Sequence, residues 1–441
     1  MGVLIMVGQV ILGLSILIVL HELGHFLAAR AFGIKVEKFY LFFDAWGVKL
    51  FKFNYKGCEY GIGWLPLGGY VKIAGMIDES MDTEQLKGEP QPWEFRSKPA
   101  WQRLIVMLGG IIVNIIVGIL VFWMLTFKMG NTDIKMDQLA NGILPGSIGE
   151  SIGLKAGDKV IAIDGHRVEN YSELLGSKVL MGGVALTVER DGATTEIKVP
   201  ADLLNTLSDK KGEKFISPRE KTMSIAQVAP GSVASKMGFT KGDSIVALND
   251  TPVPFFDQFR TLVKANINKP VVIKVIRAGA EVSLKGNVPA DAMLGISVNH
   301  DNSIKSFTTN YSLMEAFPIG AKKAFTVITD NAKGFGKIFK GEVRADKALS
   351  GPIGIATLFG TEVDWIRFWS LVGMLSMALA FMNLLPIPAL DGGHVVFLLI
   401  EMIQGKPLSE KFLEKAQMVG FFILLGLMVF IFGNDIFKLF K

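Results

Sequence analysis

Three residues near the N-terminus have the types and the spacing of a zinc-hydrolase site. His21 and His25 are four residues apart, so on a helix both imidazoles lie on one face and can ligate the same metal ion. Glu22 lies beside them, where a carboxylate can act as general base toward a water molecule at the metal. The residues before this motif, 3–20, contain no charged side chain. Because ionisable groups are costly at membrane depth, this position indicates an active site inside a membrane.

The metal needs a third protein ligand, because catalytic zinc usually has three and keeps one position open. The candidate is Asp391, which follows an apolar segment and two prolines, Pro386 and Pro388. The prolines break a helix and the glycine pair after Asp391 allows a turn, so the carboxylate is presented from irregular structure at membrane depth. His394, three residues further on, is the alternative ligand.

The composition predicts a membrane protein with soluble parts. Of the 441 residues, 50% are hydrophobic and 20% are charged, which is too apolar for a soluble protein of several domains and too charged for one that is all membrane. The net charge of +5 is small and scattered, and no basic block with interleaved aromatic residues argues for nucleic acid. The single cysteine, Cys58, excludes an intramolecular disulfide.

Four apolar segments meet, or nearly meet, the length of about 20 residues that crosses a bilayer. They are residues 3–27, 104–127, 368–390 and 421–437. A large domain separates the second from the third, so the first and third run in the same direction and bring both halves of the metal site to the same depth. Lysine and arginine are concentrated in the loops between spans one and two and between spans three and four. The positive-inside rule therefore places these loops in the cytoplasm, and both termini and the large domain outside.

The first cytoplasmic loop is expected to contain a β-hairpin. Alternating residues at 51–55 are followed by a Lys56-Gly57 turn and by a glycine-rich strand over 59–73. The apolar face of this hairpin either dips into the membrane beside the site or packs on the transmembrane helices. Residues 77–99 are polar and contain several prolines, which predicts a linker.

The middle of the chain contains a repeat of 85 residues. Pro-Gly-Ser at 145–147 returns at 230–232, and Gly-Asp at 157–158 returns at 242–243. The repeat resembles the PDZ domain in its permuted bacterial form, which implies two mixed α/β modules that bind peptides or act as a steric gate or spacer. Leu294, Gly295 and Ile296 resemble the peptide-binding loop of the second copy, whereas the first copy has Lys214 and Phe215 where the family usually has glycine.

Residues 303–347 form an amphipathic, basic segment in which lysines are interleaved with phenylalanines. We expect a helix that lies on the outer leaflet or clamps an incoming substrate helix. The alternative is a helix that covers the neighbouring domain or the outer ends of the spans.

The chain resembles the site-2 protease family of intramembrane zinc metalloproteases over nearly its whole length. The resemblance rests on His-Glu-Leu-Gly-His at 21–25, Pro-Leu-Gly-Gly-Tyr at 66–70, the tandem PDZ-like modules, and the Asn…Pro…Leu-Asp-Gly motif at 383–392. It implies zinc as cofactor, Glu22 as the catalytic residue, and three ligands: His21, His25 and Asp391. It also implies a group of substrate-binding residues: Asn383, Pro388, Gly68, Gly69 and Asn114.

The expected fold class is an α-helical polytopic membrane protein with four transmembrane helices, two inserted mixed α/β PDZ-like domains and a membrane-associated β-hairpin loop. The expected parts are the first span with the zinc motif (1–34), a cytoplasmic loop with the hairpin (35–103), the second span (104–128), the two PDZ-like domains (129–220 and 221–300), an amphipathic connecting segment (301–365), the third span (366–391), a second cytoplasmic loop (392–414) and the fourth span (415–441).

The predicted function is hydrolysis of peptide bonds within transmembrane segments of single-span membrane proteins, as in regulated intramembrane proteolysis. The resemblance implies anti-sigma-factor-like substrates after a first cleavage, or signal-peptide remnants. It also implies a bacterial inner membrane, with the site toward the cytoplasm and the PDZ-like domains on the periplasmic or outer side. One alternative is a membrane-anchored PDZ scaffold with a structural zinc site, against which Glu22 argues because such a site needs no base. Another is a zinc peptidase of a different lineage that cuts soluble peptides in a chamber.

Overall fold

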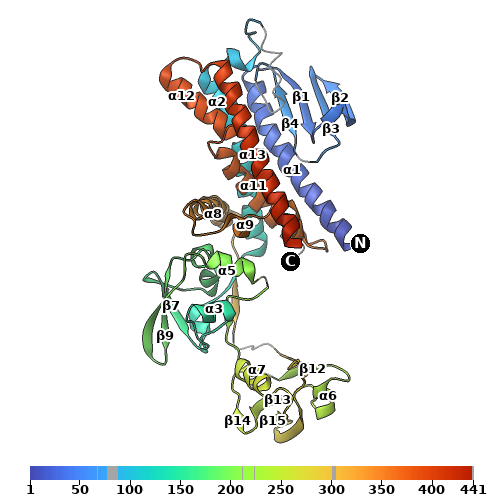
Figure 1. The fold of residues 1–441 in the computed structure, drawn as a ribbon, viewed down its shortest axis with the longest axis vertical. Coiled ribbons are helices and arrows are strands. Elements are labelled where there is room, and N and C mark those ends of the chain that lie inside the picture. Colours follow the sequence, from blue (N-terminus) through green and yellow to red (C-terminus); the bar gives the residue numbers. More distant parts are fainter. Residues whose placement is uncertain (67, 77–87, 211, 223, 300–303, 440–441) are drawn as a thin grey trace. The chain divides into compact units, whose positions relative to one another are not determined.

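The computed structural model describes the chain except for residues 67, 77–87, 211, 223, 300–303 and 440–441 (Figure 1). The first part of the expected linker, 77–87, and position 67 of the 66–70 motif therefore lie outside the described residues. The chain forms two compact units. One consists of Met1–Asn131 with Asn310–Lys441, and the other of Thr132–Thr309.

Four long apolar helices form the framework of the first unit. They are α1 (Gly2–Ala31), α2 (Ala100–Met129), α11 (Trp365–Leu384) and α13 (Glu410–Leu439). In the part of the chain that the structure describes, four helices are long and apolar enough to cross a membrane, as the sequence predicts. The third ends six residues before the expected position 390, because Pro386 and Pro388 cannot continue a helix.

A further helix, α12 (Asp391–Gln404), begins at Asp391 itself. The sequence assigns most of this stretch to a cytoplasmic loop, 392–414, whereas the structure has a helix whose Val395 and Leu398 are buried. These side chains belong to a core that also includes Val106 of α2. Packing of this apolar stripe on α2 explains why the segment is ordered as a helix.

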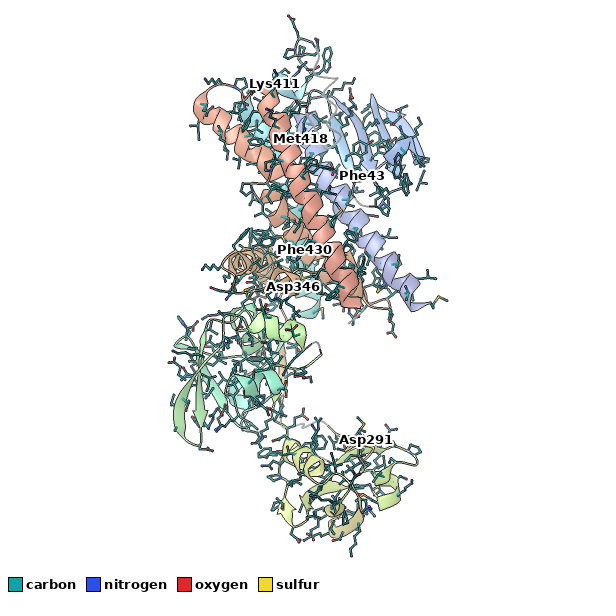
Figure 2. The ribbon with its side chains drawn as sticks, in the orientation of Figure 1. Phe43, Asp291, Asp346, Lys411, Met418 and Phe430 are labelled. Carbon is teal, nitrogen blue, oxygen red and sulfur yellow. The ribbon has the colours of Figure 1, made fainter. Side chains whose placement is uncertain are left out.

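α2 is the central helix of the unit, because it contacts α1, α11, α12 and α8 (Leu313–Phe339). α13 is more peripheral and leaves many apolar side chains exposed. Met418 and Phe430, labelled along this helix in Figure 2, are each 43% exposed. Such exposure suits a helix that faces lipid, where no water is in contact with the apolar surface.

A four-stranded sheet lies beside the C-terminal half of α1 (Figure 1). It consists of β1 (Val36–Leu41), β2 (Lys49–Tyr55), β3 (Cys58–Gly63) and β4 (Tyr70–Ile73), in the order β2-β3-β1-β4. β2 and β3 are antiparallel across the Lys56-Gly57 turn, and β1 is parallel to β3. The stretch 59–73, expected as one strand, instead forms β3 and β4, with β1 between them. The buried residues of β1 are Val36 and Tyr40.

The second unit contains two modules with corresponding elements. The first has β6 (Ile143–Pro145), α3 (Ser147–Ser151), β7 (Lys159–Ile163), β8 (His166–Arg167), a 3-10 helix η5 (Tyr171–Leu175), α4 (Ser177–Leu180), β9 (Ala185–Arg190), β10 (Ala193–Lys198), α5 (Leu203–Asp209) and β11 (Ile216–Pro218). The second has β12 (Ile225–Val228), α6 (Val233–Met237), β13 (Ser244–Leu248), β14 (Thr251–Pro252), α7 (Phe256–Ala265), β15 (Pro270–Arg277), β16 (Ala280–Asn287) and β17 (Ile296–Val298). β5 (Asn131–Ile134) pairs with β18 (Ser306–Thr309).

The main sheets of the two modules have the same strand order, β10-β9-β7-β8 and β16-β15-β13-β14. Each module has a hydrophobic core of its own. Each also has an ion pair at the same place: Arg190 donates to Asp158 in the first, and Arg277 donates to Asp243 in the second. Residues 171–179 of the first copy are divided between η5 and α4, whereas the corresponding part of the second copy is the continuous helix α7.

The connecting segment of the first unit contains α8, α9 (Ala345–Ala348) and α10 (Pro352–Phe359). α8 packs on α2 and α11. Trp123 Nε1 donates to the carbonyl oxygen of Leu313 at 2.7 Å, and a Cβ at Gly320 would lie 2.5 Å from the Cα of Trp123. This packing corresponds to the second of the two expectations, a helix that covers the spans.

Candidate active site and metal centre

Three ligand atoms from two helices converge in the first unit. The Nε2 atoms of His21 and His25, both on α1, lie 3.4 Å apart. The Oδ2 atom of Asp391, at the start of α12, lies 3.3 Å from the first and 3.4 Å from the second. Both imidazoles are buried and the carboxylate is half-buried. The three ligands expected from the sequence therefore form one cluster, although Asp391 is 366 positions after His25 in the chain.

This triangle has the dimensions of a zinc site. Ligand atoms bonded to a tetrahedral zinc ion at about 2.0–2.1 Å lie roughly 3.4 Å from one another. The observed separations of 3.3, 3.4 and 3.4 Å match that value. Two imidazoles and one carboxylate are also a ligand set of catalytic zinc, which keeps its fourth position open. The residues present therefore fit zinc.

The remaining ring nitrogen of each histidine faces α2. His25 Nδ1 lies 2.9 Å from the backbone carbonyl oxygen of Val106, which can only accept a hydrogen bond. His21 Nδ1 lies 3.1 Å from the side-chain amide of Asn114. Gly110 lies between these two positions, where a Cβ would be 2.4 Å from His25 Nε2 and 2.5 Å from His21 Cε1. Only glycine allows α2 to approach both rings this closely.

Asn383 lies on the last turn of α11, at the edge of the ligand triangle. Its Nδ2 atom is 3.1 Å from His21 Nε2 and 3.4 Å from Asp391 Oδ2. Pro388 lies in the turn between α11 and α12, where its carbonyl oxygen would be 1.8 Å from a Cβ at Gly420 of α13. This turn therefore packs directly against α13. The contact with α13 holds the turn that precedes Asp391 in place.

Glu22 lies between the ligand triangle and the sheet. Its carboxyl group lies near the backbone N–H of Val71 on β4 and near both histidines. A Cβ at Gly69 would be 2.6 Å from Ile18 and 3.7 Å from the Cγ of Glu22. A Cβ at Gly68 would be 2.8 Å from the ring of Phe43. Gly69 thus lets the segment before β4 pass close to α1, and Gly68 lets it pass close to Phe43.

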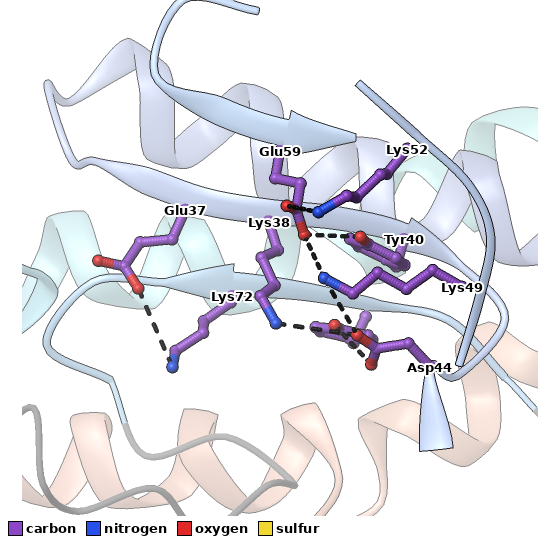
Figure 3. A network of polar contacts seen from close by, with 9 residues as sticks. Glu37, Lys38, Tyr40, Asp44, Lys49, Lys52, Glu59 and Lys72 are labelled. Atoms are coloured by element: carbon purple, nitrogen blue, oxygen red, sulfur yellow. Dashed lines mark hydrogen bonds and ion pairs between the residues drawn. The ribbon is translucent and has the colours of Figure 1, made fainter. Parts of the chain in front are cut away.

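A network of polar side chains connects the strands of this sheet (Figure 3). Glu59 Oε1 accepts hydrogen bonds from Lys49 Nζ at 2.7 Å and from the Tyr40 hydroxyl at 2.6 Å. These bonds, that from Lys49 above all, lower the pKa of Glu59 to about 2, and burial raises the pKa of Tyr40 to about 12. On β4, the Tyr70 hydroxyl donates to Asp44 at 2.9 Å. The network therefore fixes the position of β4 relative to the other strands.

A cavity of about 100 Å³ adjoins the triangle and is lined by His21, Asn383, Asp391, His394 and Gln417, with Met76, Met107, Ala389 and Leu390. A cavity of this size holds about three water molecules. His394 Nε2 lies 2.5 Å from the side-chain nitrogen of Gln417 on α13. Among the described residues, the group that can hold a metal consists of His21, His25 and Asp391 and does not include His394.

The predicted peptide-binding loop lies in the second unit. The carbonyl oxygen of Leu294 accepts from the N–H of Ala234 at 2.8 Å, and that of Gly295 accepts from the N–H of Ala229 at 2.9 Å. Gly295 has a φ of +82°, which favours glycine. Ile296 begins β17, which pairs with β12. The loop is therefore held in one conformation by the backbone of its own module.

Two contributors to the site were not identified from the sequence. Val106 acts through its backbone carbonyl, which leaves no signal in the side-chain pattern. Gln417 is a polar residue next to the apolar fourth span, and polar residues at membrane depth are unusual enough to mark a functional position. The sequence therefore contained a signal for Gln417. Its contact with His394 could be assigned only from the fold.

Comparison with known proteins gives a family match and full-length relatives. The model of peptidase family M50 matches residues 9–427. The regulator of sigma-E protease RseP of Escherichia coli K12 is 30% identical, over 97% of this chain and 98% of the relative. The regulator of sigma E protease of Haemophilus influenzae is 29% identical, over 98% of both chains. A putative zinc metalloprotease of Vibrio cholerae is 29% identical, over 97% of this chain and 98% of the relative.

Proposed function

Because this chain belongs to peptidase family M50, we propose that it hydrolyses peptide bonds within the transmembrane segments of single-span membrane proteins. The resemblance to site-2 proteases, and to the regulator of sigma-E protease in particular, is confirmed by the family match and the relatives. The chain is thus a zinc metalloendopeptidase of a membrane. Its substrates, its orientation and the roles of individual residues belong to the proposal.

The observation that carries the proposal is the position of the ligand triangle among apolar helices. His21 and His25 lie in the C-terminal half of α1, a helix long and apolar enough to cross a membrane. We infer that a peptide bond that reaches these ligands comes from a chain that is itself within the membrane. We assign His21, His25 and Asp391 as the zinc ligands and Glu22 as the catalytic residue.

Zinc, when bound, lowers the pKa of a coordinated water molecule and polarises the scissile carbonyl group. Glu22 takes the proton from the attacking water and later delivers it to the leaving amine. Asn383, whose amide lies beside His21 Nε2, is placed to contact the substrate backbone next to the scissile bond.

The substrate must be extended at the site, because the carbonyl groups of an intact helix are already hydrogen bonded within it. β4 offers an edge for this purpose: it is the outermost strand of its sheet, and in the described part of the chain it pairs only with β1. A substrate strand added to this edge would run past Glu22. Gly68 and Gly69 lie directly before β4, and a side chain at either position would collide with Phe43 or Ile18 and displace this edge.

The sheet itself has an aromatic surface that suits contact with lipid. Phe51, Phe53 and Tyr55 on β2 are 58%, 50% and 57% exposed. Exposed aromatic groups in a row are unusual on a surface in water but favourable at a membrane interface. We propose that this part of the sheet is embedded in the membrane beside the site.

The location we propose is a bacterial inner membrane, with the active site toward the cytoplasm and the second unit on the periplasmic or outer side. The relatives named for regulation of sigma-E support anti-sigma-factor-like substrates, cut after a first cleavage, and signal-peptide remnants are a further class. We further propose that the two modules of the second unit are PDZ domains. Residues 294–296 would contact a peptide or a substrate ectodomain, and the pair would exclude bulky ectodomains.

The test is cleavage of a short single-span reporter by purified full-length protein and by Glu22→Gln, with zinc content measured in both. We expect cleavage by the wild type alone and equal zinc in both, because glutamine keeps the size of the side chain but cannot accept a proton. A rate decrease of about 10²–10⁴-fold is typical for loss of a general base. Zinc in both proteins without cleavage of several unrelated spans would favour the scaffold function instead.

A further inference from the structure

We propose that Asn114 is a positioning residue for the metal site: its Oδ1 atom accepts a hydrogen bond from His21 Nδ1–H and thereby directs His21 Nε2 to zinc. This inference deepens the proposed function and rests on the zinc ligation assigned above. The resemblance to site-2 proteases placed Asn114 among the substrate-binding residues. In the structure it is buried on α2 and contacts the Nδ1 atom of His21, which is the ring nitrogen outside the ligand triangle.

Burial is the first observation. Asn114 has no exposed surface. Its backbone carbonyl oxygen accepts a hydrogen bond from the hydroxyl of Ser376 on α11 at 2.8 Å, which fixes this turn of α2 against its neighbour. A side chain enclosed in this way between helices cannot reach a substrate backbone, but it can act on the residue it contacts.

The second observation is the contact with His21. The Asn114 amide lies 3.1 Å from His21 Nδ1, whereas the Nε2 atom of the same ring belongs to the ligand triangle. A neutral imidazole that gives Nε2 to a metal carries its proton on Nδ1 and needs an acceptor there. Asn114 Oδ1 is the group that can supply it.

The third observation concerns the orientation of the amide. In the structure, Nδ2 faces His21, and Oδ1 is buried without a hydrogen-bond partner among the described residues. The nitrogen and oxygen of a side-chain amide are assigned from their surroundings, because they have nearly the same size. Exchanging them places the oxygen on Nδ1–H and the NH₂ group at the buried end. The requirement that Nε2 be free for zinc decides in favour of the exchanged orientation.

The fourth observation is that the Nδ1 atoms of both histidines contact polar groups of α2. Val106, Gly110 and Asn114 are spaced by four residues and lie along one stripe of the helix. The first accepts from His25 Nδ1, the second leaves space for the rings, and the third meets His21 Nδ1. One helix thus selects the tautomer of both ligands, once through a backbone carbonyl and once through a side chain.

The experiment compares zinc affinity by chelator competition in the purified full-length wild type and in Asn114→Leu, Asn114→Asp and Thr126→Val. Leucine keeps the volume of asparagine and removes the acceptor, whereas aspartate keeps an acceptor. Thr126 is the matched control, because it is another buried polar residue of α2 and its hydroxyl has no partner among the described residues. Asn114→Ala serves as a second variant without an acceptor if leucine prevents folding.

We expect Asn114→Leu to lower zinc affinity by about 10- to 100-fold, the usual effect of losing an outer partner of a metal ligand. Asn114→Asp should restore affinity to within a few-fold, and Thr126→Val should leave it unchanged. The absorption spectrum of the cobalt-substituted protein should also change in the leucine variant, because the orientation of one ligand changes. Thermal unfolding of the zinc-free proteins tests whether the fold is intact.

Equal zinc affinity in the wild type and in a folded Asn114→Leu variant would overturn the inference. If the KM for the reporter rose at the same time, Asn114 would instead act on substrate. Failure of the proposed function gives a different result: the wild type binds zinc but cuts no single-span reporter, and the loss of zinc affinity in Asn114→Leu is still measurable.

Discussion

Gly24 and Gly109 are in direct backbone contact: a Cβ at Gly24 would lie 2.2 Å from the carbonyl oxygen of Gly109. Gly24 directly precedes His25 in the metal motif of α1, and Gly109 directly precedes Gly110 on α2. The contact is what allows α2 to hold the Nδ1 atoms of both histidines. Substitution at this crossing should therefore affect zinc binding as well as folding.

We expect Gly24→Ala to destabilise the protein by about 1–3 kcal/mol, the usual cost of forcing an extra carbon into a packed interior, and to lower zinc affinity. Gly8→Ala is the matched control on the same helix, because a Cβ there would meet no atom within 4 Å. Unfolding in detergent and zinc titration measure the two effects. Equal behaviour of the two variants would show that the α1–α2 crossing is looser than these contacts indicate.

Asp391→Asn should abolish stoichiometric zinc binding and cleavage, because the amide lacks the charge and basicity of the carboxylate ligand. Removal of zinc from the wild type with a chelator should stop cleavage, and added zinc should restore it. His394→Asn is the informative comparison, since His394 is the rival ligand. Zinc lost in His394→Asn but kept in Asp391→Asn would assign the third ligand to the histidine.

Glu59→Gln should lower the stability of the sheet in a way that depends on pH. The pKa of Glu59 is about 2 in the folded protein, below its ordinary value of 4.5. The ionised carboxylate therefore stabilises the fold above about pH 4.5, and this contribution is lost as the pH falls toward 2. Thermal unfolding from pH 7 to pH 2.5 should show a difference between wild type and variant that shrinks in acid.

Glu37→Gln provides the control for that measurement. Glu37 lies on β1 of the same sheet, but its ion pairs, 3.6 Å to Lys35 and 4.0 Å to Lys72, are longer. Loose surface pairs contribute little. A difference for Glu37→Gln as large as that for Glu59→Gln would mean that general charge, rather than the network around Tyr40, stabilises the sheet.

Reporter spans with helix-destabilising residues near the scissile bond should be cut faster than uniformly stable spans, because the substrate must be extended at β4. One glycine weakens a helix by about 1 kcal/mol, which corresponds to a rate increase of roughly fivefold if unwinding limits cleavage. Rates for a polyleucine span and for the same span with one or two glycines give the answer. Equal rates would contradict an unwinding step.

Deletion of residues 146–298 should permit cleavage of a reporter that keeps a bulky ectodomain, if the two modules exclude such substrates. Cleavage of the short reporter should remain, since both parts of the metal site lie in the first unit. A deletion variant that cuts the short reporter but not the bulky one would contradict the proposal that the two modules exclude bulky ectodomains.

The four apolar helices could be predicted from the amino-acid sequence, and so could the group formed by His21, His25 and Asp391, which we propose as ligands. Helical spacing places two imidazoles on one face, and an uncharged segment before them identifies membrane depth. These are local properties, in which residue type and separation along the chain suffice. The 85-residue repeat was also visible, because its two copies carry the same turn residues.

The groups that support those ligands could be assigned only from the packed chain. The role of Val106 depends on a backbone carbonyl, and that of Asn114 on the crossing of α1 and α2 at two glycines. The split of residues 59–73 into β3 and β4 depends on insertion of β1, which no local pattern shows. Such features arise from contacts between segments far apart in the chain, so their physical cause exists only once the helices and the sheet have packed together.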